Sequence, residues 1–131
     1  AWCLAEAEYG AGDRGTPGQA NRRCVPLPPF TTVELQARFD EDCAFCHTQG
    51  GASGTMTLDD FPETTIGVPS SESPLDRIEP GDAEASYLFN KLRGTQFAVG
   101  GVGDRMPQGG PFWTEDDLAR LRAYIDALPP Q

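Results

Sequence analysis

The residues with the most distinctive chemistry are two cysteines and a histidine that stand together at Cys43-Ala44-Phe45-Cys46-His47. This C-x-x-C-H spacing is typical of covalent haem attachment. Two thiols about one helical turn apart can reach the two vinyl groups on one edge of a porphyrin and form thioethers. The imidazole next in the chain is then carried under the ring to the iron. The pattern predicts one covalently bound haem c, attached through Cys43 and Cys46, with His47 as an iron ligand.

Two other kinds of site also use a C-x-x-C pair. A zinc site would need two more ligands nearby, but the other two cysteines lie before residue 30 and the chain has a single histidine. A thioredoxin-like redox pair accompanies an alternating strand–helix pattern, which this sequence lacks. Haem attachment is therefore the interpretation that we favour.

The second axial ligand of the iron must be sought among other residue types, because His47 is the only histidine. Methionine or a vacant position are the alternatives. Met106 lies 59 positions after His47, in a loop with Pro107 and two glycines that suits the flat face of a ring. Met56 lies only nine positions after His47, and we interpret it as flexible packing beside the haem. We predict Met106 as the second ligand; Met106 as packing is the alternative.

Hydrophobic periodicity indicates helices on both sides of this motif. A helix capped by Thr31 or Thr32 is expected to run into the cysteine pair, and it would carry the apolar stripe Val33, Leu35, Phe39 and Phe45. A short helix is expected around Leu58–Ile66. Asp82 is expected to cap another helix, whose apolar face would carry Tyr87, Leu88 and Leu92.

The last predicted helix has the strongest signals. Thr114 and Asp117 resemble a capping box, and the stripe Leu118, Leu121, Ile125 and Leu128 follows before two prolines. No run of residues suggests a strand of any length. With 15 Gly and 12 Pro among 131 residues, the sequence predicts an all-α domain with long, irregular loops.

The first 30 residues differ from the rest of the chain. They show little periodicity, so we expect a loop-like extension over residues 1–30, followed by a helical domain over residues 31–131. The extension holds the remaining cysteines, Cys3 and Cys24. An even remainder of two suggests a disulfide between them; two unpaired thiols are the alternative.

The charge bears on partners and location. Residues 31–131 hold 17 acids and 7 bases and carry the whole net charge of −10. Such a surface repels nucleic acid and anionic lipid and favours partners with a basic docking face, unless the acidity serves solubility alone. No stretch approaches the ~20 apolar residues that cross a bilayer. A disulfide and a start at Ala1 lead us to expect a periplasmic or otherwise extracytoplasmic protein after removal of a signal peptide.

Several motifs together resemble the class I bacterial cytochromes c. These are the C-x-x-C-H after a first helix, the downstream Met-Pro loop and the closing helix. The stretches GVPSSESPLDRIEPGDAEASYLFNKLRGTQ and DRMPQGGPFWTEDDLARLRAYIDAL are similar to a subgroup of bacterial monohaem domains. The resemblance covers roughly residues 31–129. It implies a small cytochrome c-like helical domain wrapped around one haem, with the first and last helices crossing beside the haem edge.

The same resemblance implies Cys43 and Cys46 as attachment sites, His47 as the proximal ligand and Met106 as the distal ligand. The cysteine-bearing extension lies outside the shared pattern. So does Trp113, which could pack on the porphyrin, hydrogen-bond a propionate or simply cover the core.

Arg77 and Arg105 are further candidates to neutralise the haem propionates, although both could equally be solvated at the surface.

The leading functional hypothesis is a soluble, monomeric electron carrier that passes single electrons between larger redox proteins. We expect no enzymatic activity, because the only histidine is already used and no nucleophile–base pair is recognisable. One alternative is an electron-entry subunit or domain of a larger oxidoreductase complex. A haem-based sensor or peroxidase, in which Met106 dissociates, is a further alternative.

Overall fold

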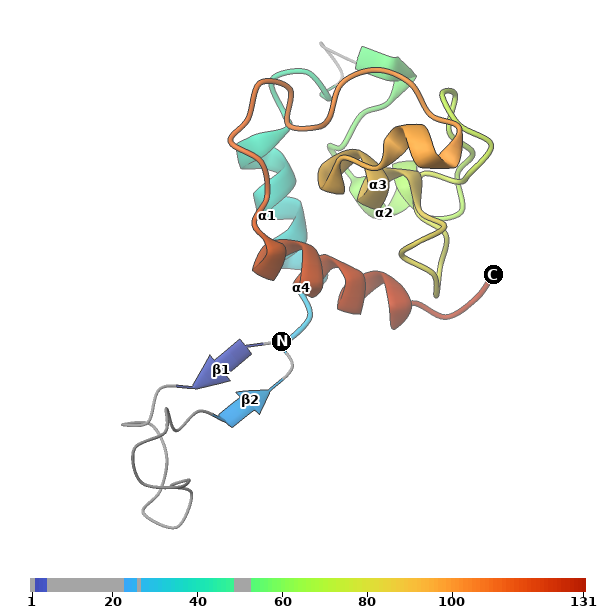
Figure 1. The fold of residues 1–131 in the computed structure, drawn as a ribbon. Coiled ribbons are helices and arrows are strands. Elements are labelled where there is room, and N and C mark those ends of the chain that lie inside the picture. The colour runs from blue at the N-terminus through green and yellow to red at the C-terminus, as the bar shows by residue number, and fades with distance from the viewer. Residues whose placement is uncertain (1, 5–22, 26, 49–52) are drawn as a thin grey trace.

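The computed structural model describes residues 2–4, 23–25, 27–48 and 53–131. This part of the chain is mostly helical, as predicted (Figure 1). Its helices are α1 (Thr32–Asp42), α2 (Phe61–Thr65), α3 (Tyr87–Arg93) and α4 (Glu115–Asp126), with short 3₁₀ turns η3 (Ser53–Thr55) and η4 (Gln96–Val99). Long irregular connections separate them, in keeping with the high content of glycine and proline.

Two short strands pair near the N-terminus, β1 (Trp2–Leu4) and β2 (Arg23–Val25). The expectation that no strand of any length is present was therefore wrong, because three residues are too few to show an alternating pattern. The strands are antiparallel, and Cys3 lies directly opposite Cys24. Facing residues of such a ladder have Cα atoms about 4.5–5.5 Å apart, which is within the range that a disulfide spans. The disulfide itself stays a prediction.

Helix α1 begins with the capping box formed by Thr31 and Glu34, each of which accepts a hydrogen bond from the other's backbone N–H. Leu35 and Phe39, one turn apart, are buried as predicted. Val33 and Phe45 were wrongly assigned to the same stripe, since their exposed fractions are 80% and 98%. Val33 projects from another side of the helix, and Phe45 lies beyond the helix end at Asp42, where helical periodicity no longer applies.

Helix α3 begins later than the sequence suggested. Asp82 does accept a hydrogen bond from the backbone N–H of Ala85, but this bond closes only a turn. The helix starts only after Ser86. The Ser86 hydroxyl donates a hydrogen bond to the carbonyl of Asp82, and such local side-chain bonds compete with helical hydrogen bonding. Tyr87, Leu88 and Leu92 are buried on α3, as expected.

Helix α4 agrees with its prediction in its N-cap and its first three apolar positions, but it ends at Asp126, so Leu128 lies beyond it. The Thr114 side chain accepts a hydrogen bond from the backbone N–H of Asp117, and Leu118, Leu121 and Ile125 are buried. The helix is linked to α1 by ion pairs of Arg38 with Asp117 and of Arg120 with Glu34. The first and last helices of this domain therefore lie against each other.

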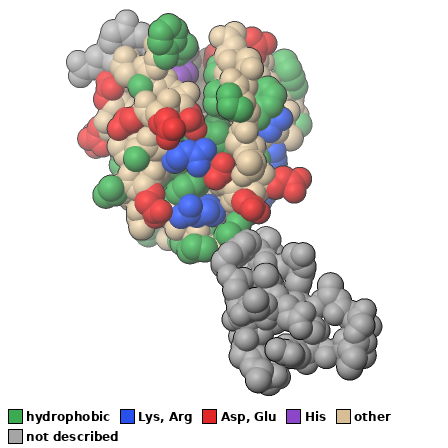
Figure 2. Space-filling model, turned by 90° about the vertical axis from the view of Figure 1, so that its left-hand side faces the viewer, with side chains coloured by type: hydrophobic (Ala, Val, Ile, Leu, Met, Phe, Trp, Pro, Cys, Tyr) green, Lys and Arg blue, Asp and Glu red, His purple; other side chains and the backbone are tan. Residues whose placement is uncertain are grey.

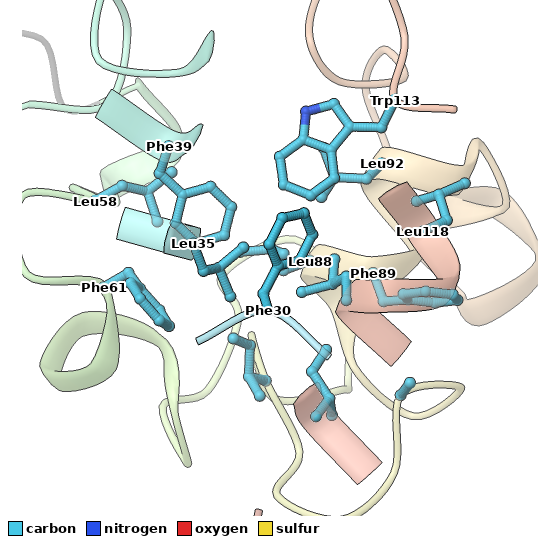
Figure 3. Close-up of a cluster of buried hydrophobic side chains, with 14 residues drawn as sticks. Phe30, Leu35, Phe39, Leu58, Phe61, Leu88, Phe89, Leu92, Trp113 and Leu118 are labelled. Atoms are coloured by element: carbon cyan, nitrogen blue, oxygen red, sulfur yellow. The ribbon is translucent and has the colours of Figure 1, made fainter. Parts of the chain in front are cut away.

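The core is built from all four helices and the loops between them (Figure 3). Phe39 of α1 packs edge-on against Phe61 of α2, with ring centroids 5.1 Å apart. It also stacks on Trp113, at 5.9 Å and 21°. Aromatic pairs of these kinds add to the free energy gained from burial alone. Phe39 is therefore the link between α1, α2 and the loop before α4.

No helix in the described ranges is long and apolar enough to span a lipid bilayer.

Phe39 on α1 and Phe45 beyond its end provide a test of the core. Phe39 is 1% exposed and Phe45 is 98% exposed. We expect Phe39→Ala to lower the free energy of unfolding by about 3–5 kcal/mol, because it leaves a cavity among aromatic rings. Phe45→Ala should change it by less than about 0.5 kcal/mol. Urea denaturation followed by circular dichroism measures both, and equal losses would show that the core is wrongly described.

Candidate functional site

The C-x-x-C-H motif forms a tight turn directly after α1. The backbone N–H of Cys43 donates to the carbonyl of Phe39, so the turn continues the hydrogen bonding of the helix. The N–H groups of Cys46 and His47 both donate to the carbonyl of Cys43, at 3.2 and 3.0 Å. Cys43 and Cys46 are free thiols about one turn apart. This is the local geometry that the motif requires.

The imidazole of His47 is oriented by the loop that follows it. Its Nδ1 lies 3.2 Å from the backbone carbonyl oxygen of Met56. A carbonyl can only accept a hydrogen bond, so Nδ1 carries a hydrogen, and in the neutral imidazole Nε2 then keeps a free lone pair. Histidines that bind metals are commonly fixed in this way by a carbonyl behind the ring. The arrangement leaves Nε2 ready to act as a ligand.

A cavity of about 450 Å³ opens beside this turn. Small-molecule and cofactor sites commonly measure about 300–1,000 Å³. Hydrophobic side chains flank a furrow in the upper half of the face drawn in Figure 2. The residues around the cavity include the three of the motif, both methionines of the chain and one arginine: Cys43, Cys46, His47, Met56, Met106 and Arg77. Apolar wall residues include Phe39, Leu58, Leu88 and Leu92.

Met106 reaches the cavity from the opposite part of the chain, in a loop tied to α3. Its backbone N–H donates to the carbonyl of Lys91 at 2.9 Å. The Lys91 ammonium donates to the carbonyls of Val102 and Asp104, at 2.9 and 3.1 Å. Arg105 Nε donates to the carbonyl of Leu92 at 3.0 Å. Side chains thus supply the hydrogen bonds that an irregular loop cannot make with itself.

Tyr87 fixes the same loop from the other end. Its hydroxyl accepts a hydrogen bond from the backbone N–H of Val102 at 3.2 Å and lies 3.1 Å from a carboxylate oxygen of Glu72. Gly101 allows this approach, because a Cβ atom there would lie 2.5 Å from the Tyr87 hydroxyl oxygen. Tyr87, which is expected on the apolar face of its helix, also lines the cavity.

Three residues that we had considered for haem contacts differ in position. Arg77 lines the cavity, but its guanidinium donates to the backbone carbonyls of Thr64 and Thr55, at 2.8 and 3.2 Å. Arg105 and Trp113 line a second cavity instead. The Trp113 indole N–H donates to Asp42 at 2.9 Å. With only 4% of its surface exposed, Trp113 fits the reading that it covers the core.

Asp42, Tyr87 and Lys91 line the cavity although sequence reasoning did not select them as site residues. Asp42 directly precedes Cys43 in the sequence, and this position alone could have predicted that it lies at the cavity. Tyr87 and Lys91 come together with the Met106 loop only in three dimensions, and the sequence gives no sign of this.

The Cys43 thiol is a poor nucleophile in this setting. Burial, reinforced by the nearby Asp42 carboxylate, raises the pKa of Cys43 to about 12. The thiol is therefore protonated at neutral pH, whereas dithiol redox motifs work through a thiolate with a lowered pKa. In the part of the chain that the structure describes, no group of three His, Cys, Asp or Glu side chains could hold a metal ion.

Comparison of the chain with protein-family models, with curated proteins and with solved structures gave no match.

The Tyr87 hydroxyl provides a test of how the Met106 loop is held. We expect Tyr87→Phe to speed amide exchange at Val102, which loses its acceptor, and at Met106, because the loop opens more often. The increase should be roughly fivefold, since one hydrogen bond contributes about 1 kcal/mol. Tyr124→Phe is the matched control, because it removes a hydroxyl contact with Thr32, far along the sequence from this loop. Unchanged exchange in Tyr87→Phe would contradict the assignment.

Proposed function

We propose that this chain is a c-type cytochrome that carries single electrons through one covalently attached haem. The observation that carries the proposal is the composition of the larger cavity. The residues around it include Cys43, Cys46 and His47 together with Met106, which lies 59 positions after His47 in the sequence. Thiols, an imidazole and a thioether around one apolar space are the donor set that a haem of this kind requires.

The residues present fit such a group. Cys43 and Cys46 would form the thioethers, and His47 would bind the iron through Nε2, because Nδ1 is engaged with Met56. Met106 would supply the second iron ligand from the other side of the sequence motif's cavity. Bound haem would supply an iron that cycles between the ferric and ferrous states. The chain's own residues orient the imidazole, present the sulfur and surround the site with apolar walls.

Histidine and methionine as the two iron ligands would favour electron transfer over catalysis. A methionine sulfur is a soft donor that favours ferrous iron, and this raises the reduction potential. If His47 and Met106 both bound the iron, they would leave no place on it for oxygen or peroxide. Met106 is held by the backbone of α3 through Lys91, which supports a ligand that stays in place. The proposal therefore assigns no enzymatic activity to the chain.

Fold, location and partners follow as parts of the same proposal. We infer a class I cytochrome c-like arrangement of the helices around the haem, in an extracytoplasmic protein. Acidic side chains are spread over the face drawn in Figure 2, and the net charge is −10. Such a surface would steer the protein toward redox partners with a basic docking face.

The attachment chemistry can be tested by mass spectrometry. Protein matured together with a haem-attachment apparatus should gain the mass of one haem, and the gain should survive denaturation because the bond is covalent. The double variant Cys43→Ser/Cys46→Ser should show only the polypeptide mass. Cys3→Ser/Cys24→Ser is the matched control, since it also replaces two cysteines and should keep the haem. A bare polypeptide mass for the unaltered chain would refute the proposal.

The second ligand can be tested by optical spectroscopy, because both methionines line the cavity. Ferric protein with methionine ligation shows a weak far-red band from sulfur-to-iron charge transfer. We expect Met106→Ala to abolish this band and to lower the reduction potential. Met56→Ala should retain the band. If only Met56→Ala lost the band, then Met56 and not Met106 would be the iron ligand, and this assignment would be wrong.

A further inference from the structure

Lys91 is the only lysine of the chain, and its side chain, on α3, is only 12% exposed. Its ammonium donates to the backbone carbonyls of Val102 and Asp104, at 2.9 and 3.1 Å. It also lies 3.4 Å from a carboxylate oxygen of Glu72. An ammonium has three hydrogens to donate, so these three acceptors can satisfy it. Of the three, only the Glu72 carboxylate is charged, and a cation so poorly exposed to water needs such a partner.

The same oxygen of Glu72 also meets Tyr87. Tyr87 and Lys91 are four positions apart on α3 and therefore lie on one face of the helix. The Tyr87 hydroxyl lies 3.1 Å from Oε2 of Glu72 and equally far from the carbonyl oxygen of Val102. Of these two acceptors, the carboxylate is charged and forms the stronger hydrogen bond. One carboxylate thus serves both side chains of α3 that hold the Met106 loop.

Glu72 itself belongs to a different segment, the irregular chain over residues 67–80 that precedes α3. Its backbone N–H donates to the Ser70 hydroxyl at 3.1 Å. Nearby, the Ser73 hydroxyl donates to the carbonyl of Val99 at 2.9 Å, 26 positions further along the chain. The segment that carries Glu72 is therefore fixed against the part of the chain that leads into the Met106 loop.

The connection from Glu72 to Met106 passes through Lys91. The backbone N–H of Met106 donates to the Lys91 carbonyl, and the Lys91 ammonium holds Val102 and Asp104 of the same loop. Removal of one partner of a poorly exposed ion pair leaves the other charge uncompensated. Without the Glu72 charge, the ammonium would therefore be more stable in water than at the two carbonyls. An ammonium that turns toward water releases both carbonyls, so the loop would open more often.

We propose that Glu72 is a positioning residue for Met106, which keeps the Lys91 ammonium on the Met106 loop and thereby slows the entry of outside ligands to the iron. The inference rests on the proposed function, in which Met106 binds the iron. It deepens that proposal, because it assigns to one acidic residue on a separate segment the difference between a closed electron carrier and an iron site that binds ligands. Glu72 and Met106 both line the larger cavity, so the effect acts at that site.

Amide hydrogen exchange of Glu72→Gln, followed by NMR on the full chain as matured, tests the effect on the loop. This variant keeps the size of the side chain and removes its charge. We expect exchange at Val102 and Met106 to become about tenfold faster, because a charge-assisted hydrogen bond is lost. Exchange at Leu121, which is buried on α4, should be unchanged, because the core is not altered.

Displacement of Met106 by imidazole tests the effect on the iron. In ferric protein, imidazole should remove the far-red sulfur-to-iron band about tenfold faster in Glu72→Gln than in the unaltered chain. Glu63→Gln is the matched control. It changes the net charge equally, but Glu63 is an exposed residue of α2 and does not line the cavity. Its exchange and displacement rates should equal those of the unaltered chain.

The possible failures point to different errors. Unchanged exchange at Val102 and Met106, equal acceleration at Leu121, or the same effects in Glu63→Gln would each overturn the role of Glu72 and leave the haem proposal intact. Faster exchange without faster displacement by imidazole would also overturn it. A chain that carries no haem would overturn the proposed function and with it the effect on ligand entry, whereas the exchange rates would still decide whether Glu72 holds the loop.

Discussion

The hydrogen bond between Nδ1 of His47 and the carbonyl of Met56 is the constraint on which the site depends. It decides which imidazole nitrogen can act as a ligand, and it ties the C-x-x-C-H turn to the chain that follows. A second bond, from the N–H of Leu58 to the His47 carbonyl at 2.6 Å, fixes the backbone of the same residue. Leu58 is buried in the core. The orientation of the ring is thus set by the same packing that stabilises the fold.

The other side of the cavity is built on a different principle. The loop around Met106 has no regular secondary structure, so α3 serves as its support through the side chains of Tyr87 and Lys91 and the carbonyls of Lys91 and Leu92. Each of these bonds satisfies a backbone group or fixes a side chain that would otherwise need water. The two walls of the cavity therefore come from separate parts of the sequence, and the core between them sets their separation. Stability and the geometry of the cavity are linked for this reason.

Local signals predicted what depends on local interactions. The helix that leads to Cys43, the cap at Thr114 and the buried residues of α4 each follow from neighbouring residues, and the structure has them as expected. Interactions over long sequence distances were not predictable. The sequence made Arg105 a candidate to neutralise the haem propionates. In the structure its Nε donates to the carbonyl of Leu92, its Cδ lies close to Gly94, and it lines the second cavity. The haem and its ligands are not tested by the fold, and they stay predictions from the motif.

Trp113 connects the two cavities. It lines the second, and its indole N–H donates to Asp42, which lines the first and directly precedes Cys43. The same carboxylate receives hydrogen bonds from Arg38, whose guanidinium carbon lies 4.6 Å from the centroid of the Trp113 rings. A displacement of the indole would therefore remove one of the donors that hold the Asp42 carboxylate beside the cysteine turn. The Asp42 side chain is only 26% exposed, so the loss of a donor there has a cost, and the packing of Trp113 and the position of the motif depend on each other.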